Sequence, residues 1–257
     1  MKCQKPFGLV SSHAPFQILG VIPARWASAR FPGKPLHRIA GKPLIQHVWE
    51  RCAEASELQR VVVATDDARI AEAVDAFGGE AVLTDSHHAS GTDRVAEAAA
   101  KTGEYSHVIN VQGDEPLISP GLIDALAAKM RRNPAIDMIT AANPIHDESE
   151  FLDPNVVKVV IDAAGAALYF SRSAIPFARN ESALPRYRHN GIYGFSTPFL
   201  QQFVQWKPSP LEIAEALEQL RALENGARIH VVVTGDVALG VDTPAQAREI
   251  EILIEQA

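Results

Sequence analysis

Positively charged side chains are concentrated in one short segment near the N-terminus of this 257-residue chain. Positions 25 to 42 contain no acid and five cations: Arg25, Arg30, Lys34, Arg38 and Lys42. The overall Lys and Arg frequency would place about two cations there. The segment follows the apolar run Ile18 to Ile22, which is typical of a buried strand. On these residues alone, a solvated loop and a binding site for a small anion such as a phosphate are both open.

Two aspartates far apart in the chain have the surroundings of metal ligands. Asp114 lies in Asn-Val-Gln-Gly-Asp-Glu-Pro (110–116), at the end of the apolar run Val108 to Val111. Asp242 lies in Gly-Val-Asp-Thr-Pro (240–244). Mg²⁺ prefers one or two carboxylates together with substrate phosphates, so the pair predicts a magnesium site beside the cations. The alternative for each aspartate is a helix N-cap or a turn, which is commoner for a single acidic residue.

The common nucleotide-binding fingerprints are missing from the sequence. Gly33-Lys34 is followed by Pro35, without the Ser or Thr of a Walker A loop, and no G-x-G-x-x-G motif occurs. These facts argue against an ATPase of the P-loop type and against a dinucleotide-dependent dehydrogenase.

Two further pairs of residues are candidates for ligand contacts, and a histidine pair is not. Ser90 and Gly91 precede a predicted helix, whose N-terminus offers backbone N–H groups to a polar ligand, although a simple cap is the alternative. His189 and Tyr193 are evenly spaced and are expected on one face of a strand, where ordinary strand residues are the alternative. His87-His88 has no partner at metal-ligand spacing and is expected at the surface.

The elements that must position these residues alternate between strands and helices. Apolar runs predict strands at 18–22, 61–64, 80–83, 108–111 and 138–142, separated by amphipathic helices at 43–55, 70–77, 92–101 and 122–130. Thr65-Asp66 is the expected cap of the second helix. This alternation predicts an α/β fold with a mostly parallel sheet, at whose strand ends a ligand binds.

The pattern changes after position 150. Strands at 156–161, 166–170 and 192–195 predict a small antiparallel flap, inserted at about 154–196. A long helix is expected at 211–223, a buried strand at 229–233 and a closing helix at 244–254. We expect an N-terminal extension over 1–17 and a single domain over 18–257.

Composition narrows the class of protein. Hydrophobic residues make up 47% of the chain, which supports a packed core, and no apolar run approaches the roughly 20 residues of a membrane span. The net charge of −7 disfavours nucleic acid and membrane surfaces as partners. Polar residues and prolines interrupt the hydrophobicity of positions 1–20, which therefore lack the apolar core of a signal peptide, and we expect a cytoplasmic protein. Cys3 and Cys52 cannot form a disulfide framework, so we expect free thiols.

Together these stretches resemble the CMP-Kdo synthetases, the 3-deoxy-manno-octulosonate cytidylyltransferases. The matching segments span nearly the whole chain in order: PARWASARFPGKPL (23–36), ATD (64–66), SGTDR (90–94), NVQGDEP (110–116), PNVVKVV (154–160), ALYFSRSAIP (167–176), RHNGIYGF (188–195), PSPLE and LEQLR (208–221) and GVDTP (240–244). The resemblance implies the Rossmann-like fold of nucleotide-diphospho-sugar transferases, a flap used in dimerisation, Mg²⁺ dependence, a cytoplasmic homodimer and a role in lipopolysaccharide synthesis.

The implied reaction joins CTP and 3-deoxy-manno-octulosonate (Kdo) to give CMP-Kdo and pyrophosphate. By resemblance, the catalytic residues are Arg25, Lys34, Asp114 and Asp242, and the last two hold magnesium. Nucleotide-binding positions match at Ala24, Arg25, Lys34, Ser90, Gly91 and Gln112. Sugar-acid positions match at Arg30, Gln112, His189, Tyr193, Glu218 and Gln219. Two alternatives remain: a cytidylyltransferase for another sugar acid, such as 8-amino-Kdo or a sialic-acid-like substrate, and a non-catalytic nucleotide-binding protein.

Overall fold

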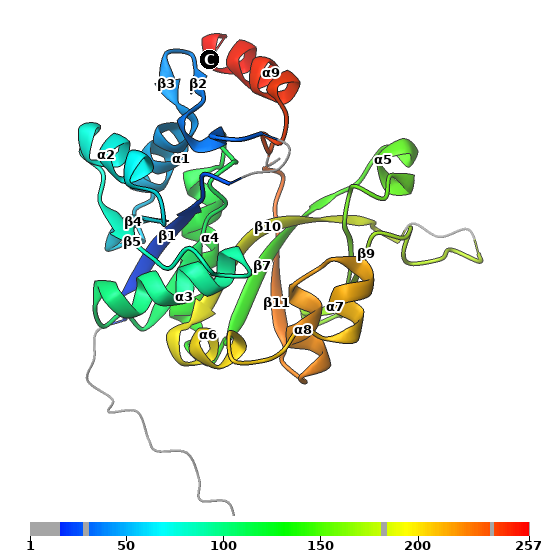
Figure 1. The fold of residues 1–257 in the computed structure, drawn as a ribbon. Coiled ribbons are helices and arrows are strands. Elements are labelled where there is room, and N and C mark those ends of the chain that lie inside the picture. Colours follow the sequence, from blue (N-terminus) through cyan, green and yellow to red (C-terminus); the bar gives the residue numbers. More distant parts are fainter. Residues whose placement is uncertain (1–15, 28–30, 181–183, 237–238, 257) are drawn as a thin grey trace, which may run out of the picture.

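The chain folds around one mixed sheet covered by helices on both faces. In the computed structural model, which describes residues 16–27, 31–180, 184–236 and 239–256, this sheet has nine strands (Figure 1). Seven of them run in the order β11-β7-β10-β6-β1-β4-β5, and β8 and β9 extend from β10. The predicted α/β fold with a mostly parallel sheet is confirmed. Residues 1–15 of the predicted extension lie outside the described part of the chain.

The parallel half of the sheet is formed by the predicted apolar runs. Its strands are β1 (Ile18–Ala24), β4 (Arg60–Thr65), β5 (Ala81–Leu83) and β6 (His107–Asn110). β1 lies between β4 and β6 and is parallel to both. β1, β4 and β6 are largely buried on both faces and so need continuous apolar sequence, whereas β5 is the edge strand and is partly exposed. β7 (Met138–Pro144) and β11 (Ile229–Val233) form a second parallel pair.

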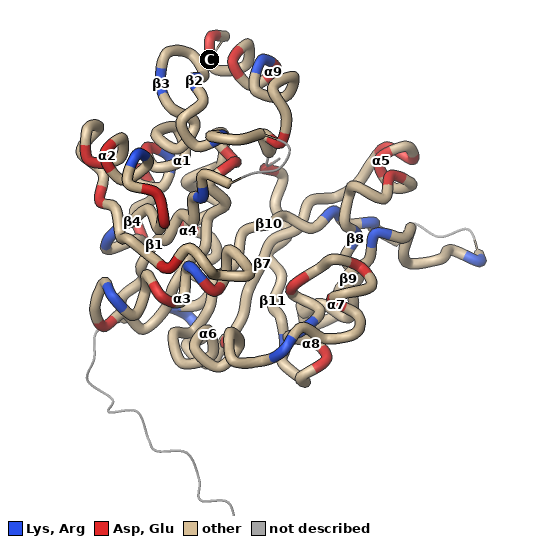
Figure 2. The backbone as a smooth tube through the Cα atoms, viewed as in Figure 1, with Lys and Arg blue, Asp and Glu red and all other residues tan. Residues whose placement is uncertain are grey.

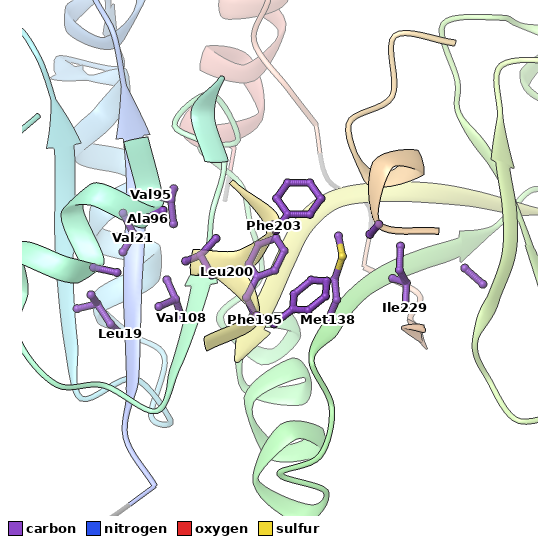
Figure 3. Packing of buried hydrophobic residues seen from close by; sticks show 14 of the residues in the cluster. Leu19, Val21, Val95, Ala96, Val108, Met138, Phe195, Leu200, Phe203 and Ile229 are labelled. Carbon is purple, nitrogen blue, oxygen red and sulfur yellow. The ribbon is translucent and has the colours of Figure 1, made fainter. Parts of the chain in front are cut away.

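Two clusters of buried side chains fix the helices on opposite faces of the sheet. On one face, Leu19 and Val21 of β1 belong to a cluster with side chains of α3 (Gly91–Thr102), α6 (Thr197–Phe203) and α8 (Gln219–Glu224). Figure 3 shows the part of this cluster that includes Val95 of α3 and Leu200 of α6. On the other, Ile18 and Ile22 pack with α1 (Leu44–Ala53), α2 (Ala68–Ala76) and α4 (Pro120–Arg132). The two faces of β1 alternate along the strand, as a pleated strand requires.

β10 (Tyr187–Ser196) belongs to the central sheet, which corrects the prediction for 192–195. The strand runs antiparallel between β6 and β7 and is ten residues long. Only β8 (Lys158–Ile161) and β9 (Ala167–Ser171) form the expected hairpin, which pairs with the beginning of β10. A Cβ at Gly194 would lie 2.7 Å from the side chains of Ile139 and Met130, so glycine is required where α4 packs on this strand.

The predicted helix at 211–223 is two short helices, α7 (Pro210–Glu215) and α8. Ala216 between them adopts a left-handed conformation (φ 52°, ψ 49°), which ends α7. The expected cap at Thr65-Asp66 is also displaced, because Asp67 caps α2 by accepting a hydrogen bond from the Arg69 backbone N–H.

A small antiparallel hairpin supports the C-terminal helix. Its strands, β2 (Arg38–Ile39) and β3 (Lys42–Pro43), lie beside α9 (Pro244–Glu255), with Ile39 and Ile250 in a shared apolar cluster (Figure 1). This contact helps to place the start of α9, and with it Asp242, beside the segment that follows β1.

Charged residues are mixed along the visible elements, with one local grouping. Figure 2 shows the acidic α5 (Glu148–Leu152) close to basic residues around β8 and the start of β10. Arg186 pairs there with Glu148, and Arg188 pairs with Glu150 at 3.0 Å. Within the described ranges, no helix is both long and apolar enough to cross a bilayer.

Candidate active site

A cleft of about 310 Å³ lies at the carboxyl ends of β1 and β6. It is lined from the β1 end by Pro23, Ala24 and Arg25, from the short helix η1 (Lys34–Leu36) by Lys34 and Pro35, from the start of α3 by residues 88–91 and Arg94, and from the loops after β6 and before α9 by Gln112, Gly113, Asp114 and Asp242. Ligands of open α/β sheets bind at this edge. Five segments spread between positions 23 and 242 therefore meet where the α/β pattern predicts a ligand.

The loop after β1 folds back so that Lys34 reaches the cleft. Gly33 adopts a left-handed conformation (φ 70°) and its N–H donates to the Trp26 carbonyl at 3.2 Å. A Cβ at Gly33 would meet the Trp26 ring at 3.1 Å. The guanidinium of Arg69 stacks on the Trp26 ring, 3.4 Å from the ring centroid. Glycine at position 33 is thus required both by the backbone angle and by the aromatic ring.

The Lys34 ammonium bridges the two predicted aspartates. Its Nζ donates to Asp114 Oδ2 at 2.6 Å and to Asp242 Oδ1 at 3.3 Å. The lysine side chain is only 14% exposed, whereas those of Asp114 and Asp242 are 33% and 44% exposed. Both carboxylates therefore converge on one cation and still face solvent, where a further ligand can reach them.

Backbone packing holds the two aspartate loops together. The Val241 N–H donates to the Asp114 carbonyl at 2.8 Å. A Cβ at Gly113 would lie 2.5 Å from the Pro23 carbonyl oxygen, so this glycine lets the loop after β6 approach β1. Thr243, not Asp242, caps α9 and accepts from the Gln246 N–H. The alternative N-cap role for the Asp242 side chain is thereby excluded.

The aspartate pair suits a hard divalent cation. Carboxylate oxygens are the ligands that Mg²⁺ prefers, and Mg²⁺ commonly takes one or two of them with waters and substrate phosphates. Within the described ranges, no three His, Cys, Asp or Glu side chains gather as a metal site. The residues fit a magnesium ion that is held mainly by its phosphate ligand and water.

The opposite end of the cleft is built on the N-terminus of α3. Ser90 caps this helix in a capping box with Asp93. The absence of a side chain at Gly91 leaves open space beside it, since even a Cβ at this position would lie 3.8 Å from the nearest atom, Pro23 Cγ. Arg94 is buried, donates to Thr84 Oγ1 and lies 3.4 Å from Asp66 Oδ1. His87 is exposed, as expected, whereas His88 is partly buried, lines the cleft and pairs with Glu97.

Several of the residues matched to the sugar acid also lie close together. Gln112 Nε2 donates to the Gly191 carbonyl at 3.1 Å, and the rings of His189 and Tyr193 are 5.4 Å apart. Burial lowers the pKa of His189 to about 3, so this ring is neutral at pH 7. Burial, with the negative charges of Glu218 and Glu115, raises the pKa of the Tyr193 hydroxyl well above its usual range.

Gln219 follows Glu218 in α8 and is buried, with no hydrogen-bond partner for its Nε2 in the described part of the chain. Arg30 lies outside the described residues. A second cavity of about 350 Å³ adjoins the cleft at Ser90 and is lined also by Pro208, Glu212, Ile213, Ala216, Leu217 and Glu218.

Glu115 is a buried acid that the sequence reasoning did not single out. Burial, with the neighbouring charge of Asp114, raises its pKa to about 8, and the charge of Arg188 opposes this shift. Its Oε2 has no hydrogen-bond partner in the described chain. The Asp-Glu pair in the motif was the available signal, but only the fold decides that Asp114 faces the cleft while Glu115 turns inward.

Comparison with known proteins places this site in context. A family model described as cytidylyltransferase matches residues 19–229. The 3-deoxy-manno-octulosonate cytidylyltransferase of Geobacter sulfurreducens is 50% identical over 244 residues, covering 91% of this chain and 97% of the relative. The enzyme of the same name from Pseudomonas syringae pv. tomato is 51% identical over 247 residues, with the same coverage.

A solved structure of a CMP:2-keto-3-deoxy-manno-octonic acid synthetase complexed with CTP superimposes with a TM-score of 0.90 and 44% identity. The alignment covers 93% of this chain and 99% of that one. A cytidylyltransferase from Leptospira borgpetersenii, at 18% identity and a TM-score of 0.65, shares the fold.

Proposed function

This chain belongs to the cytidylyltransferase family, and on that premise we propose that it transfers CMP from CTP to Kdo, releasing pyrophosphate. The observation that carries the proposal is the convergence of Lys34, Asp114 and Asp242 in a cleft at the strand ends. The near-complete match to relatives named for this activity supports the choice of substrates.

The cations of the cleft suit the triphosphate. Arg25 lies at the end of β1 and Lys34 on the facing turn, so both can neutralise phosphate oxygens as charge moves onto the leaving pyrophosphate. Fixed charges that need no rearrangement lower the barrier most when they match the charge of the transition state. Ser90 and Gly91 border the far end of the cleft, where the nucleoside is expected.

The reaction is an in-line displacement at phosphorus. The anomeric hydroxyl of the sugar acid attacks the α-phosphorus, a new P–O bond forms, the bond to the β-phosphate breaks, and the hydroxyl proton is released to solvent. Holding the two anions in line converts a bimolecular step into a unimolecular one. Mg²⁺, held by Asp114 and Asp242, would neutralise phosphate charge and lower the pKa of the attacking hydroxyl.

The sugar-acid half of the site is assigned to Gln112, His189, Tyr193, Glu218 and Gln219, together with Arg30. The neutral imidazole of His189, whose Nε2 lies 2.9 Å from Thr140 Oγ1, suits hydrogen bonding to sugar hydroxyls better than pairing with a carboxylate. Arg30 is then assigned to the carboxylate of the sugar acid, because arginine binds carboxylates in a bidentate manner.

The decisive experiment is incubation with CTP, Mg²⁺ and Kdo with detection of pyrophosphate, omitting each component in turn. Release only from the complete mixture is the expected result. A panel of 8-amino-Kdo and a sialic acid separates the proposal from the sugar-acid alternative. CTP binding without turnover on any of these acids would favour the non-catalytic alternative.

We also propose that the enzyme is a cytoplasmic homodimer. Leu168 on β9 and Phe177 in the following segment are 61% and 87% exposed, which supports an apolar contact near the β8–β9 hairpin. Sedimentation equilibrium tests it: a mass near 56 kDa is expected, about twice the 27.8 kDa of the chain.

A further inference from the structure

One hydrogen bond joins the nucleotide end of the cleft to the sugar-acid residues. Thr92, in the first turn of α3, is 4% exposed, and its Oγ1 donates to Glu218 Oε2 at 2.5 Å across 126 positions of sequence. We infer that Thr92 is a positioning residue, which holds the Glu218 carboxylate for the sugar acid and links it to the nucleotide-binding segment. This inference rests on the proposed function.

The chain conformation around Glu218 explains why it needs such a partner. The left-handed turn at Ala216 ends α7, and Leu217 turns into the core. Glu218 then points back toward α3, where burial raises its pKa above the usual range, opposed mainly by the hydrogen bonds from Thr92 and Ser90. A carboxylate in such surroundings depends strongly on each donor that remains.

The other groups near Glu218 are engaged elsewhere. Arg221 lies 3.5 Å from Glu218 Oε1, but its guanidinium makes two shorter bonds to Glu212, at 2.5 and 2.8 Å. The Ser90 hydroxyl is also within reach of Glu218, but it carries a single proton, for which Asp93 Oδ2 competes at 3.0 Å within the capping box. Thr92 is therefore the donor that fixes the direction of the carboxylate.

The position of Thr92 gives the contact a second consequence. Ser90, two residues earlier, lines both the cleft and the adjoining cavity that Glu218 borders. The capping box makes the first turn of α3 rigid. A nucleotide bound against Ser90 and Gly91 therefore holds Thr92 in place as part of the same rigid turn. Through Thr92 it also holds the Glu218 carboxylate before the sugar acid binds.

Thr92→Val tests the inference because valine keeps the branched shape and removes the hydroxyl. Initial rates of pyrophosphate release are measured with each substrate varied. The KM for Kdo is expected to rise about tenfold, with the KM for CTP changed less than twofold. Thr92→Ser restores the hydroxyl and is expected to recover most of the lost affinity.

Two controls separate positioning from a general structural effect. Thr102→Val removes a threonine hydroxyl at the other end of α3, where it donates to the Ala98 carbonyl within the same helix. It is expected to leave both KM values unchanged. In a Glu218→Ala background, Thr92→Val is expected to have no further effect on kcat/KM, because the two residues act through one contact.

Several results would overturn the positioning role: unchanged kinetics in Thr92→Val, no recovery in Thr92→Ser, additive losses in the double variant, or losses that follow Tm across the variants. Wild-type turnover is measured first. Absence of pyrophosphate release with Kdo in the wild type refutes the proposed function and the sugar-acid role of Thr92 with it. Wild-type turnover with an unaltered Thr92→Val refutes the positioning role alone.

Discussion

Replacing Lys34 by Met tests the central contact of the site, because the ammonium lies between the two carboxylates proposed to hold magnesium. Methionine keeps the unbranched shape and most of the length of the side chain and removes its charge. Two effects are expected together: a lower kcat, since a cation near the triphosphate is lost, and tighter Mg²⁺ binding, since an internal competitor for Asp114 and Asp242 is removed.

The magnitudes follow from the geometry. A fixed donor to developing charge contributes about 2.7 to 4 kcal/mol, so kcat is expected to fall about 10²- to 10³-fold. The 2.6 Å contact to Asp114 is a hydrogen bond between charged groups, of the kind that contributes about 1.5 to 3 kcal/mol. The Asp114 and Asp242 side chains are 33% and 44% exposed, so solvent screens both contacts. We therefore take about 1.5 kcal/mol for the Lys34–Asp114 contact and a negligible contribution from the 3.3 Å contact to Asp242. The Mg²⁺ affinity is then expected to rise about tenfold.

The assay combines pyrophosphate release at saturating substrates with calorimetric titration of Mg²⁺ in the presence of a non-hydrolysable CTP analogue. Lys42→Met is the matched control. Lys42 lies in the same basic segment, on β3, but its ammonium pairs with Glu50 of α1 at 2.8 Å. It should match the wild type in both measurements. An unchanged kcat with a raised KM for CTP would limit Lys34 to ground-state binding, and weaker Mg²⁺ binding would refute the competition.

Three further substitutions test other features. Because burial raises the pKa of Glu115 from 4.5 to about 8, folding favours its protonated form; this stabilisation is complete below about pH 4.5 and is lost as the pH rises through about 8. Glu115→Gln should therefore reduce the fall in Tm of the EDTA-treated protein between pH 5 and 8.5, and an unchanged slope would contradict the assignment. Gly113→Ala, with its Cβ 2.5 Å from the Pro23 carbonyl oxygen, should displace the Asp114 loop and lower kcat/KM at least tenfold, measured by pyrophosphate release; full activity would show that the loop adjusts freely. Ala216→Gly should stabilise the fold by up to about 1 kcal/mol in urea unfolding, since glycine adopts the left-handed turn without strain, whereas a loss of stability would argue against strain there.

Local sequence was sufficient for the elements whose signals lie within a few residues. The apolar runs of β1, β4 and β6 are continuous because these strands are buried on both faces. α3 and α9 begin at capping boxes whose residues lie three positions apart, Ser90 with Asp93 and Thr243 with Gln246. Such signals are readable because both partners are in the same short segment.

The misread elements are those in which a distant contact outweighs the local pattern. Positions 211–223 have the amphipathic pattern of one helix, without a glycine or proline to end it. The break at Ala216 accompanies burial of Leu217 and the Arg221–Glu212 ion pair. Likewise, β10 contains two glycines that weaken its strand signal, and its place between β6 and β7 depends on neighbours more than 40 positions away.

The sequence by itself determined the α/β class, the parallel strands and, through its resemblance to a known family, the candidate residues for the chemistry. Tertiary structure alone decided that Lys34 meets Asp242 across 208 positions, that Asp114 faces the cleft while Glu115 is buried, and that Thr92 reaches Glu218. The physical reason is that propensity and capping act over a few residues, whereas a binding site is formed by side chains that only sheet pairing and core packing bring together.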